Sequence, residues 1–315
     1  MRDHVFTLNA VELSQHSCLD KVCSLLPNLT TINVKYDLSP THPSISKSKM
    51  EHFRSECIAN LGRALQSTKC LCSLTLSNSQ LDDDLLRLLV TSMSKGIDKR
   101  QDGLRNTLVH LDISHNKIST DGLHIILNYF FENKEFRTDT SSGSIHGSKK
   151  KGNDVLSILN LANNLIEAEG GRTLGRILRS DTSLASLNIN LNRLGDKGCQ
   201  MLLDGLRTNT TLKDLYIASN SLSNGAIQSL CSILSRDFCK GKSQYKKKCV
   251  LETVDLSCNA IKEDDTVRLA TATSATTNLT ALDLRYQSKI ESSEMYVKAL
   301  DQIKRNLHRN EDHNQ

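Results

Sequence analysis

The stretch LSILNLANNLI (residues 156–166) is followed by two variants of itself, LASLNINLNRL (184–194) and LKDLYIASNSL (212–222). Each copy begins 28 residues after the one before it. All three fit the pattern L-x-x-L-x-L-x-x-N-x-L, in which the apolar positions and one asparagine keep fixed places. A period of this length predicts one supersecondary unit per copy, and the units stack because none can bury its apolar face alone.

The chemistry of the pattern explains its conformation. Leu159 and Leu161 alternate with Asn160, which predicts a short strand with one buried face. Asn164 stands where the chain leaves the strand, and its amide can pair backbone groups that the turn would otherwise bury unpaired. This combination is typical of a leucine-rich repeat.

A helix is expected after each strand. Gly170, Leu174 and Leu178 are spaced four residues apart, which marks one face of an amphipathic helix, and the other copies repeat the spacing. We therefore expect an α/β fold, a leucine-rich repeat horseshoe solenoid of the 28-residue ribonuclease-inhibitor-like type. Its parallel strands should lie on the concave side and its helices on the convex side.

The regularity of the pattern divides the chain into three parts. We expect irregular N-terminal cap repeats over residues 1–70, regular repeats over residues 71–290, and a C-terminal capping helix and tail over residues 291–315. End repeats must cover the core with a polar outer face, so irregularity at both ends fits caps.

The two ends carry specific expectations. Leu8, Val11 and Leu13 predict a degenerate first strand. Residues 291–308 predict a final amphipathic helix, and residues 309–315 predict a polar tail that frays. The buried face of this helix should comprise Val297, Leu300, Ile303 and Leu307.

Two insertions lengthen the period, at residues 134–153 and 236–249. The second carries six cationic residues against one aspartate, a charge of +5, which equals the formal net charge of the whole chain. A cationic loop can contact an acidic partner such as nucleic acid or the tubulin surface, or it can be a solvated insertion without a partner. The candidate basic-loop residues are Lys149, Lys150, Lys151, Lys246, Lys247 and Lys248.

The outward face of the sheet is a second candidate binding surface. The residue between the two apolar strand positions points away from the core in every repeat. An extended polar surface with a few aromatic residues suits protein binding, although the same residues can serve only to solubilise the sheet. The candidates are Asp112, Asn160, Asn188, Tyr216, Asp255 and Asp283, with Arg285, Tyr286, Asn163, Asn190 and Leu191 in the next exposed columns.

The sequence contains no motif of an enzyme or cofactor site. It has no Gly-rich phosphate loop, no G-x-S-x-G and no H-E-x-x-H. Its ten cysteines lack the spacing of a metal site or a disulfide framework, so we expect free thiols in a reducing compartment. Asp82, Asp83 and Asp84 are expected to cap a helix rather than bind a cation. We therefore expect no catalysis, no cofactor or metal, no small-molecule substrate and no membrane segment.

Four strings, in this order, resemble the leucine-rich portion of the dynein regulatory complex subunit 5 family, the t-complex-associated testis-expressed proteins. They are LNINLNRLGDKG (187–198), LRTNTTLKDL (206–215), VDLSCNAI (254–261) and LDLRYQSKIESSE (282–294). The resemblance implies a non-catalytic subunit of the nexin–dynein regulatory complex, in the cytoplasm at the axoneme of a cilium or flagellum. Its partners would be other subunits of that complex and the tubulin surface, and nucleic acid is not expected.

This chain departs from that family in two ways. It carries lysine-rich insertions, and it does not show the long N-terminal region that family members carry before their repeats. Two other readings stay open. A leucine-rich repeat activator of a small GTPase would share the period, but usually carries a strongly acidic C-terminal region. A recognition or inhibitor module of the ribonuclease-inhibitor kind would alternate cysteine with asparagine at the turn position, where this chain has asparagine at residues 116, 164, 192, 220 and 259.

Overall fold

The computed structural model describes residues 5–9, 23, 25, 29–35, 47–94, 103–131, 155–180, 183–235, 249–287 and 294–314. The chain divides into two compact units, Met1–Leu111 with Asp121–Leu156, and Asp112–Thr120 with Ser157–Gln315. The insertion expected at 134–153 lies outside the described residues, as does that at 236–249 except for Cys249. The six basic-loop lysines, Val11 and Leu13 lie outside them too.

The first unit alternates strands and helices. Its elements are β1 (Val5–Asn9), β2 (Thr31–Lys35), α3 (Lys47–Gln66), β3 (Ser73–Thr75), α4 (Asp83–Ser94), α5 (Gly103–Thr107), β4 (His110–Asp112) and α6 (Thr120–Phe131). β1 pairs in parallel with β2, and β2 with β3. The first strand includes Leu8 but begins at Val5, earlier than expected. Nothing in the sequence predicts α5, because five residues are too few to show a helical period.

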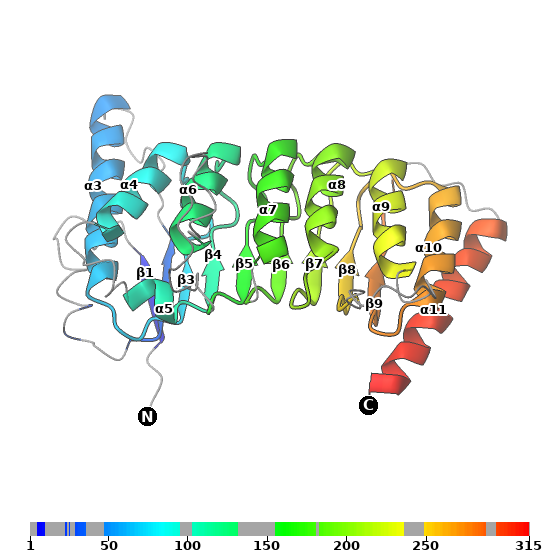
Figure 1. Ribbon diagram of the computed structural model, residues 1–315. Helices are drawn as coiled ribbons and strands as arrows, with labels where there is room; N and C mark the ends of the chain where they lie inside the picture. The colour runs from blue at the N-terminus through cyan, green and yellow to red at the C-terminus, as the bar shows by residue number, and fades with distance from the viewer. Residues whose placement is uncertain are drawn as a thin grey trace, which may run out of the picture. The chain divides into compact units, whose positions relative to one another are not determined.

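The second unit repeats the same alternation more regularly. Its elements are β5 (Ile158–Asn160), α7 (Ala168–Ser180), β6 (Ser186–Asn188), α8 (Gly195–Leu206), β7 (Asp214–Tyr216), α9 (Asn224–Leu234), β8 (Thr253–Asp255), α10 (Glu263–Ala275), β9 (Ala281–Asp283) and α11 (Glu294–Asn314). The five strands pair in parallel in chain order. Helices α7, α8, α9 and α10 stand side by side along the sheet (Figure 1).

The apolar positions of the repeat form the core of this unit. Leu159 and Leu161, which flank Asn160, are 1% and 0% exposed. The middle residues of the next strands, Leu187 and Leu215, are fully buried, and the residues on either side of each are half-buried. The strand alternation predicted from the sequence is therefore confirmed.

One asparagine per repeat ties each repeat to the one before it. The Nδ2 of Asn192 donates to the carbonyl oxygen of Ile189 in its own repeat at 3.1 Å, and to that of Leu161 in the preceding repeat at 3.0 Å. Its Oδ1 accepts the N–H of Ile166 at 3.0 Å. Equivalent bonds are made by Asn164, Asn220 and Asn259. The prediction that this asparagine pairs backbone groups of the turn is confirmed. The same side chain also bonds to backbone groups of the preceding repeat.

Gln287 makes the same bonds in the last repeat. Its Nε2 donates to the carbonyl oxygens of Leu284 at 3.2 Å and of Leu256 at 2.9 Å, and its Oε1 accepts the N–H of Ile261 at 3.2 Å. The departure from asparagine at this position therefore keeps the hydrogen-bonding function. We call the five residues Asn164, Asn192, Asn220, Asn259 and Gln287 the amide ladder.

Glycines bring the backbones of α7 and α8 together. A Cβ atom added at Gly171 would lie 2.1 Å from the carbonyl oxygen of Gly198, and one added at Gly205 would lie 2.1 Å from that of Gly175. The facing atoms belong to the backbone, so no side chain can move aside. The two helices therefore pack at a distance that only glycine permits at these positions.

Helix α9 is capped by a side chain from the repeat before it. Ser223 is the N-cap residue but makes no side-chain cap hydrogen bond. Instead, the Asp196 carboxylate accepts the N–H groups of Ser223 at 2.7 Å, Gly225 at 3.3 Å and Ala226 at 3.2 Å, and the Ser223 hydroxyl at 2.5 Å. Burial raises the pKa of Asp196, but these bonds outweigh it and hold the pKa below its usual value. The anion also lies at the positive end of the helix dipole.

The acidic run before α4 has a similar role. The Oδ1 of Asp82 accepts the N–H of Leu85 at 2.9 Å, and Asp83 and Asp84 lie in the first turn. The capping function predicted for this run is therefore confirmed at Asp82.

The last helix differs most from its prediction. α11 continues to Asn314, so the tail expected to fray from residue 309 is helical there. Val297, expected on the buried face, is 48% exposed, and the buried residues are Ala299, Ile303, Asn306 and Asn310. The Nδ2 atoms of the two asparagines donate to the carbonyl oxygens of Ala270 at 3.1 Å and Leu279 at 2.7 Å. Ile303 was expected on this face and is buried, but apolar periodicity misses Asn306 and Asn310 because they are polar and their side chains are satisfied by hydrogen bonds.

Candidate protein-binding face

The predicted column of outward-facing residues is contiguous within the second unit. Backbone pairing places Asn160 beside Asn188, Asn188 beside Tyr216, Tyr216 beside Asp255, and Asp255 beside Asp283. The Oδ2 of Asp112 accepts the Nδ2 of Asn160 at 3.0 Å, which continues the column by one position. All six side chains are half-buried.

Most members of the column also shape the turn that follows their strand. In each case Oδ1 accepts the N–H group two residues later, which forms an Asx turn. These bonds measure 2.9 Å from Asp112 to Ser114, 3.1 Å from Asn160 to Ala162, 3.0 Å from Asn188 to Asn190, 2.9 Å from Asp255 to Ser257 and 2.9 Å from Asp283 to Arg285. One side-chain atom per residue thus serves the fold, and the other end of the group remains for contacts across the face.

Tyr216 breaks this series, and the neighbouring repeat compensates. A phenol cannot form the turn, so the N–H of Ala218 is accepted by the Oδ1 of Asn190 at 2.6 Å. Burial raises the pKa of Tyr216, and the negative charges of Asp214 and Asp255 raise it further. The phenol therefore stays neutral and lies in a field that favours a cation.

Asp214 is a residue that the sequence candidates omit. It lies two positions before Tyr216 on β7, and the buried Leu215 separates them. The two side chains therefore share the outward face. The signal is the same alternation that identified the column, applied to the position one step earlier in the repeat.

The end of the face at β9 is organised by an ion pair. The guanidinium of Arg285 lies 2.6 Å from the carboxylate of Asp283, and its carbon lies 6.0 Å from the centroid of the Tyr286 ring. The hydrogen bonds from Arg285 lower the pKa of Asp283, and those to Asp283 raise the pKa of Arg285. Both groups are charged at neutral pH and largely neutralise each other.

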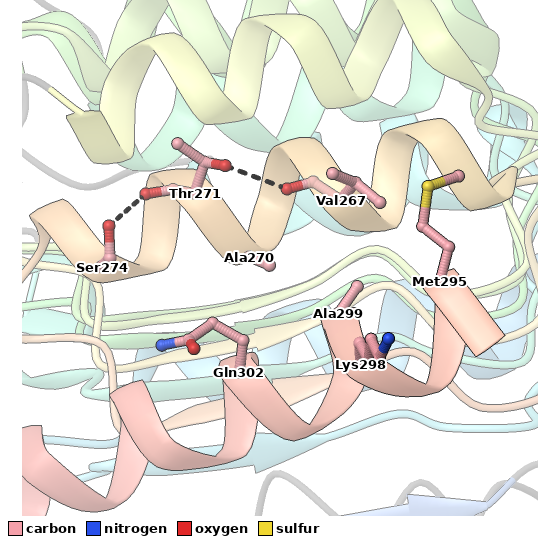
Figure 2. Close-up of a pocket in the computed structure, with 8 residues that line it drawn as sticks. All are labelled: Val267, Ala270, Thr271, Ser274, Met295, Lys298, Ala299 and Gln302. Carbon is pink, nitrogen blue, oxygen red and sulfur yellow. Dashed lines mark hydrogen bonds between the residues drawn. The ribbon is translucent and has the colours of Figure 1, made fainter.

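A hollow lies between α10 and α11, with a volume of about 440 Å³ (Figure 2). Its lining is Val267, Ala270, Thr271, Ser274, Met295, Lys298, Ala299 and Gln302. The hydroxyls of Thr271 and Ser274 donate within α10, to Val267 at 3.2 Å and to Thr271 at 2.6 Å. Gln302 donates to Asn306 at 2.9 Å. Polar groups used in this way offer little to orient a small molecule.

Within the described ranges, the side chains and helices form none of three other kinds of site. No group of three or more His, Cys, Asp or Glu side chains within them is placed to hold a metal ion. No disulfide joins the cysteines in those ranges. None of the helices in the part of the chain that the structure describes has the length and apolar character of a membrane span.

One comparison with known protein families agrees with the repeat geometry. A family model described as leucine-rich repeat matches residues 106–124 and 180–203. No curated protein matches the sequence significantly. Among solved structures, leiomodin-1 actin-binding site 2 is 12% identical with a TM-score of 0.32, and the match covers 86% of this chain and 93% of that one. An internalin from Listeria monocytogenes is 15% identical with a TM-score of 0.41, over 91% of this chain and 68% of that one.

The chain is a leucine-rich repeat α/β solenoid. The parallel strands that alternate with helices, the amide ladder and the matched family model define this class. Folds of this class are protein-binding scaffolds, because a stack of repeats offers a continuous surface.

Proposed function

We propose that the protein is a non-catalytic scaffold of the ciliary or flagellar axoneme that binds other proteins through the outward sheet face. The observation that supports binding is the contiguous polar column from Asp112 to Asp283 on a hydrogen-bonded frame. A surface of this kind suits lasting contact, since the column side chains are already oriented by their turns. The axonemal setting rests on the order of the four sequence strings between residues 187 and 294.

In this proposal the chain is similar in role to the dynein regulatory complex subunit 5 family, and its partners are other subunits of that complex. The lysine-rich insertions add an electrostatic contact to an acidic surface such as tubulin. No step of turnover is involved, and no cofactor is required.

The test is the localisation of a tagged copy in a ciliated cell, followed by extraction of the axonemes with detergent and then with salt. Retention along the doublets after detergent supports the proposal, and chemical crosslinking then identifies the neighbouring subunit. A diffuse cytoplasmic signal, or a signal at the nuclear rim, overturns it. In that case, stimulation of GTP hydrolysis by a small GTPase becomes the measurement of choice.

A further inference from the structure

Two large apolar side chains are exposed at the carboxyl-terminal edge of the strands in the second unit. Leu191, which follows β6, is 50% exposed, and Tyr286, which follows β9, is 77% exposed. Each stands immediately before the ladder residue of its repeat. Apolar side chains that flank a polar surface are characteristic of protein-binding sites.

The strands between these two residues carry negative charge. β7 and β8 lie between β6 and β9 in the sheet, and their pairing places Tyr216 beside Asp255. Asp214 lies on the same face as Tyr216. A neutral phenol between two carboxylates can accept a cation from a partner, by its ring face as well as by its oxygen.

Two ion pairs neutralise the other charges nearby. Lys213 lies 2.7 Å from Glu252, and Arg285 lies 2.6 Å from Asp283. Within the described strands β6 to β9, the charges that remain outside these ion pairs are therefore those of Asp214 and Asp255. They are opposite in sign to the formal charge of the whole chain, which is +5.

The spacing suits an extended segment of a partner. Leu191 and Tyr286 are separated by three strand spacings, roughly 14 Å, since neighbouring strands lie about 4.8 Å apart. A fully extended chain covers that distance in about four residues. In an extended segment, residues i, i+2 and i+4 point to one side. A segment with an apolar residue at i, a cation at i+2 and an apolar residue at i+4 therefore matches the side chains along this edge, which are apolar at β6, negative at β7 and β8, and apolar at β9.

We propose that Leu191, Tyr216, Asp255 and Tyr286 form a docking site, the anchor edge, for an extended basic segment of a partner protein. Leu191 and Tyr286 contact the two apolar residues of the segment, and Asp255 with Tyr216 binds the lysine or arginine between them, while Asp214 at the other end of β7 adds negative charge to the same face. This inference rests on the proposed scaffold function and names the chemistry of the partner.

The backbone of the anchor edge offers variants that separate binding from folding. Leu191 and Tyr286 have φ values of 55° and 59°, a left-handed conformation that the repeat imposes because the N–H of Leu191 donates to the carbonyl oxygen of Ala218 at 2.9 Å. Asparagine adopts this conformation more readily than leucine or tyrosine, and Asn163 occupies it one repeat earlier with φ 52°. Asparagine at these positions should therefore keep or raise the thermal stability of the protein.

The test is an array of peptides of about nine residues, with two leucines four positions apart and lysine, arginine, glutamine or glutamate midway between them. The full-length chain should bind the lysine and arginine peptides about tenfold more tightly than the glutamine and glutamate peptides at low salt. The double variant Leu191→Asn with Tyr286→Asn should lose about tenfold in affinity for the basic peptides, with an unchanged or higher Tm. Asp214→Asn with Asp255→Asn should abolish the preference for lysine over glutamine.

The matched control is Val297→Gln on α11, where the side chain is 48% exposed and lies outside the anchor edge. It should bind like the parent protein. Equal binding of all four peptides, or equal binding by the parent and the Leu191→Asn, Tyr286→Asn variant, overturns the anchor edge. Either result is compatible with axonemal retention. Loss of retention by a parent protein that still binds the basic peptides overturns the proposed function alone.

Discussion

Each residue of the amide ladder satisfies backbone groups in two repeats at once. Asn192 is 6% exposed, and its bonds reach the backbone groups of Leu161, Ile166 and Ile189. An aliphatic residue of similar size could fill the same space but could not pair these groups. Buried N–H and carbonyl groups that lose their partner are costly, so the position is specified by chemistry more than by shape.

Asn192→Ala is expected to lower the free energy of unfolding by about 2–3 kcal/mol. It removes the acceptor of the Ile166 N–H and one of two side-chain donors to each of the carbonyl oxygens of Leu161 and Ile189, which keep their bonds from Asn164 and Asn220. Chemical denaturation followed by circular dichroism measures the change. Lys197→Ala, at an exposed position on α8, is the control and should change stability by less than about 0.5 kcal/mol. A loss below about 1 kcal/mol at Asn192 would show that water replaces the side chain without penalty.

The residue scale also shows what a repeat pattern can and cannot predict. The turn role of Asn164 follows from its residue type and position. Its bond to the carbonyl oxygen of Ile113, in the preceding repeat, does not, because the pattern contains no information on the partner across the boundary. The left-handed conformation at Leu191 is likewise invisible in the sequence, since leucine seldom adopts it.

At the scale of elements, α7 and α8 depend on glycine where their backbones meet. Gly171→Ala or Gly205→Ala would place a methyl group about 2.1 Å from a backbone carbonyl oxygen, so the helices must separate. We expect each variant to lose about 2–3 kcal/mol of stability. Thermal unfolding provides the measurement. Gly195→Asn is the control: its φ of 58° suits asparagine and no heavy atom lies within 4 Å of the added Cβ, so its Tm should be close to that of the parent.

The cap on α9 makes the stability of the protein depend on pH. Its hydrogen bonds hold the pKa of Asp196 below its usual 3.8, so the charged form is bound more strongly in the folded state. The contribution is complete above pH 3.8 and is lost as the pH falls through the lower, folded-state pKa. Asp196→Asn should therefore reduce stability by about 1 kcal/mol at pH 7.

The difference in Tm between the Asp196→Asn variant and the parent should narrow as the pH is lowered below 3.8. A series of thermal melts from neutral to acid pH measures it. A difference that stays constant across the series would contradict the assignment of the cap to the ionised carboxylate.

The elements that the sequence predicts well are those whose two faces differ in polarity. β6, β7 and the helices after them follow the apolar period, and their packing follows from it. α11 shows the limit. Asn306 and Asn310 resemble a solvated face in the sequence, yet both are buried, and they donate to the backbone carbonyl oxygens of Ala270 in α10 and of Leu279 in the segment between α10 and β9.

At the scale of the whole molecule, charge is distributed unevenly along the chain. The segment from residue 236 to 249 carries a formal charge of +5, whereas the described face around β7 and β8 is negative. If the basic segment contributes to attachment, reversal of charge at Lys246, Lys247 and Lys248 should weaken retention on axonemes severalfold at low salt and leave the Tm unchanged. Unchanged retention at low salt would remove the electrostatic role of this segment.

The candidate site was predictable in position but not in chemistry. Alternation placed Asp112, Asn160 and Asp283 on one outward column, and the strand pairing bears this out. The sequence did not reveal that these carboxylate and amide groups are partly used by their own turns. It also did not reveal that Arg285 neutralises Asp283, because that contact depends on the turn geometry between them.

The amide ladder gives the stack a direction. The N–H of Ile166 donates to Asn192 and the N–H of Leu222 donates to Asn259, so each of these repeats is completed by the one that is synthesised after it. While the chain emerges from the ribosome, the most recently synthesised repeat has backbone N–H groups whose hydrogen-bond acceptors lie in the repeat that follows it. A stalled or prematurely ended chain would therefore present an unfinished repeat at its C-terminal end, a ready signal for chaperones and proteases, however well its earlier repeats had folded.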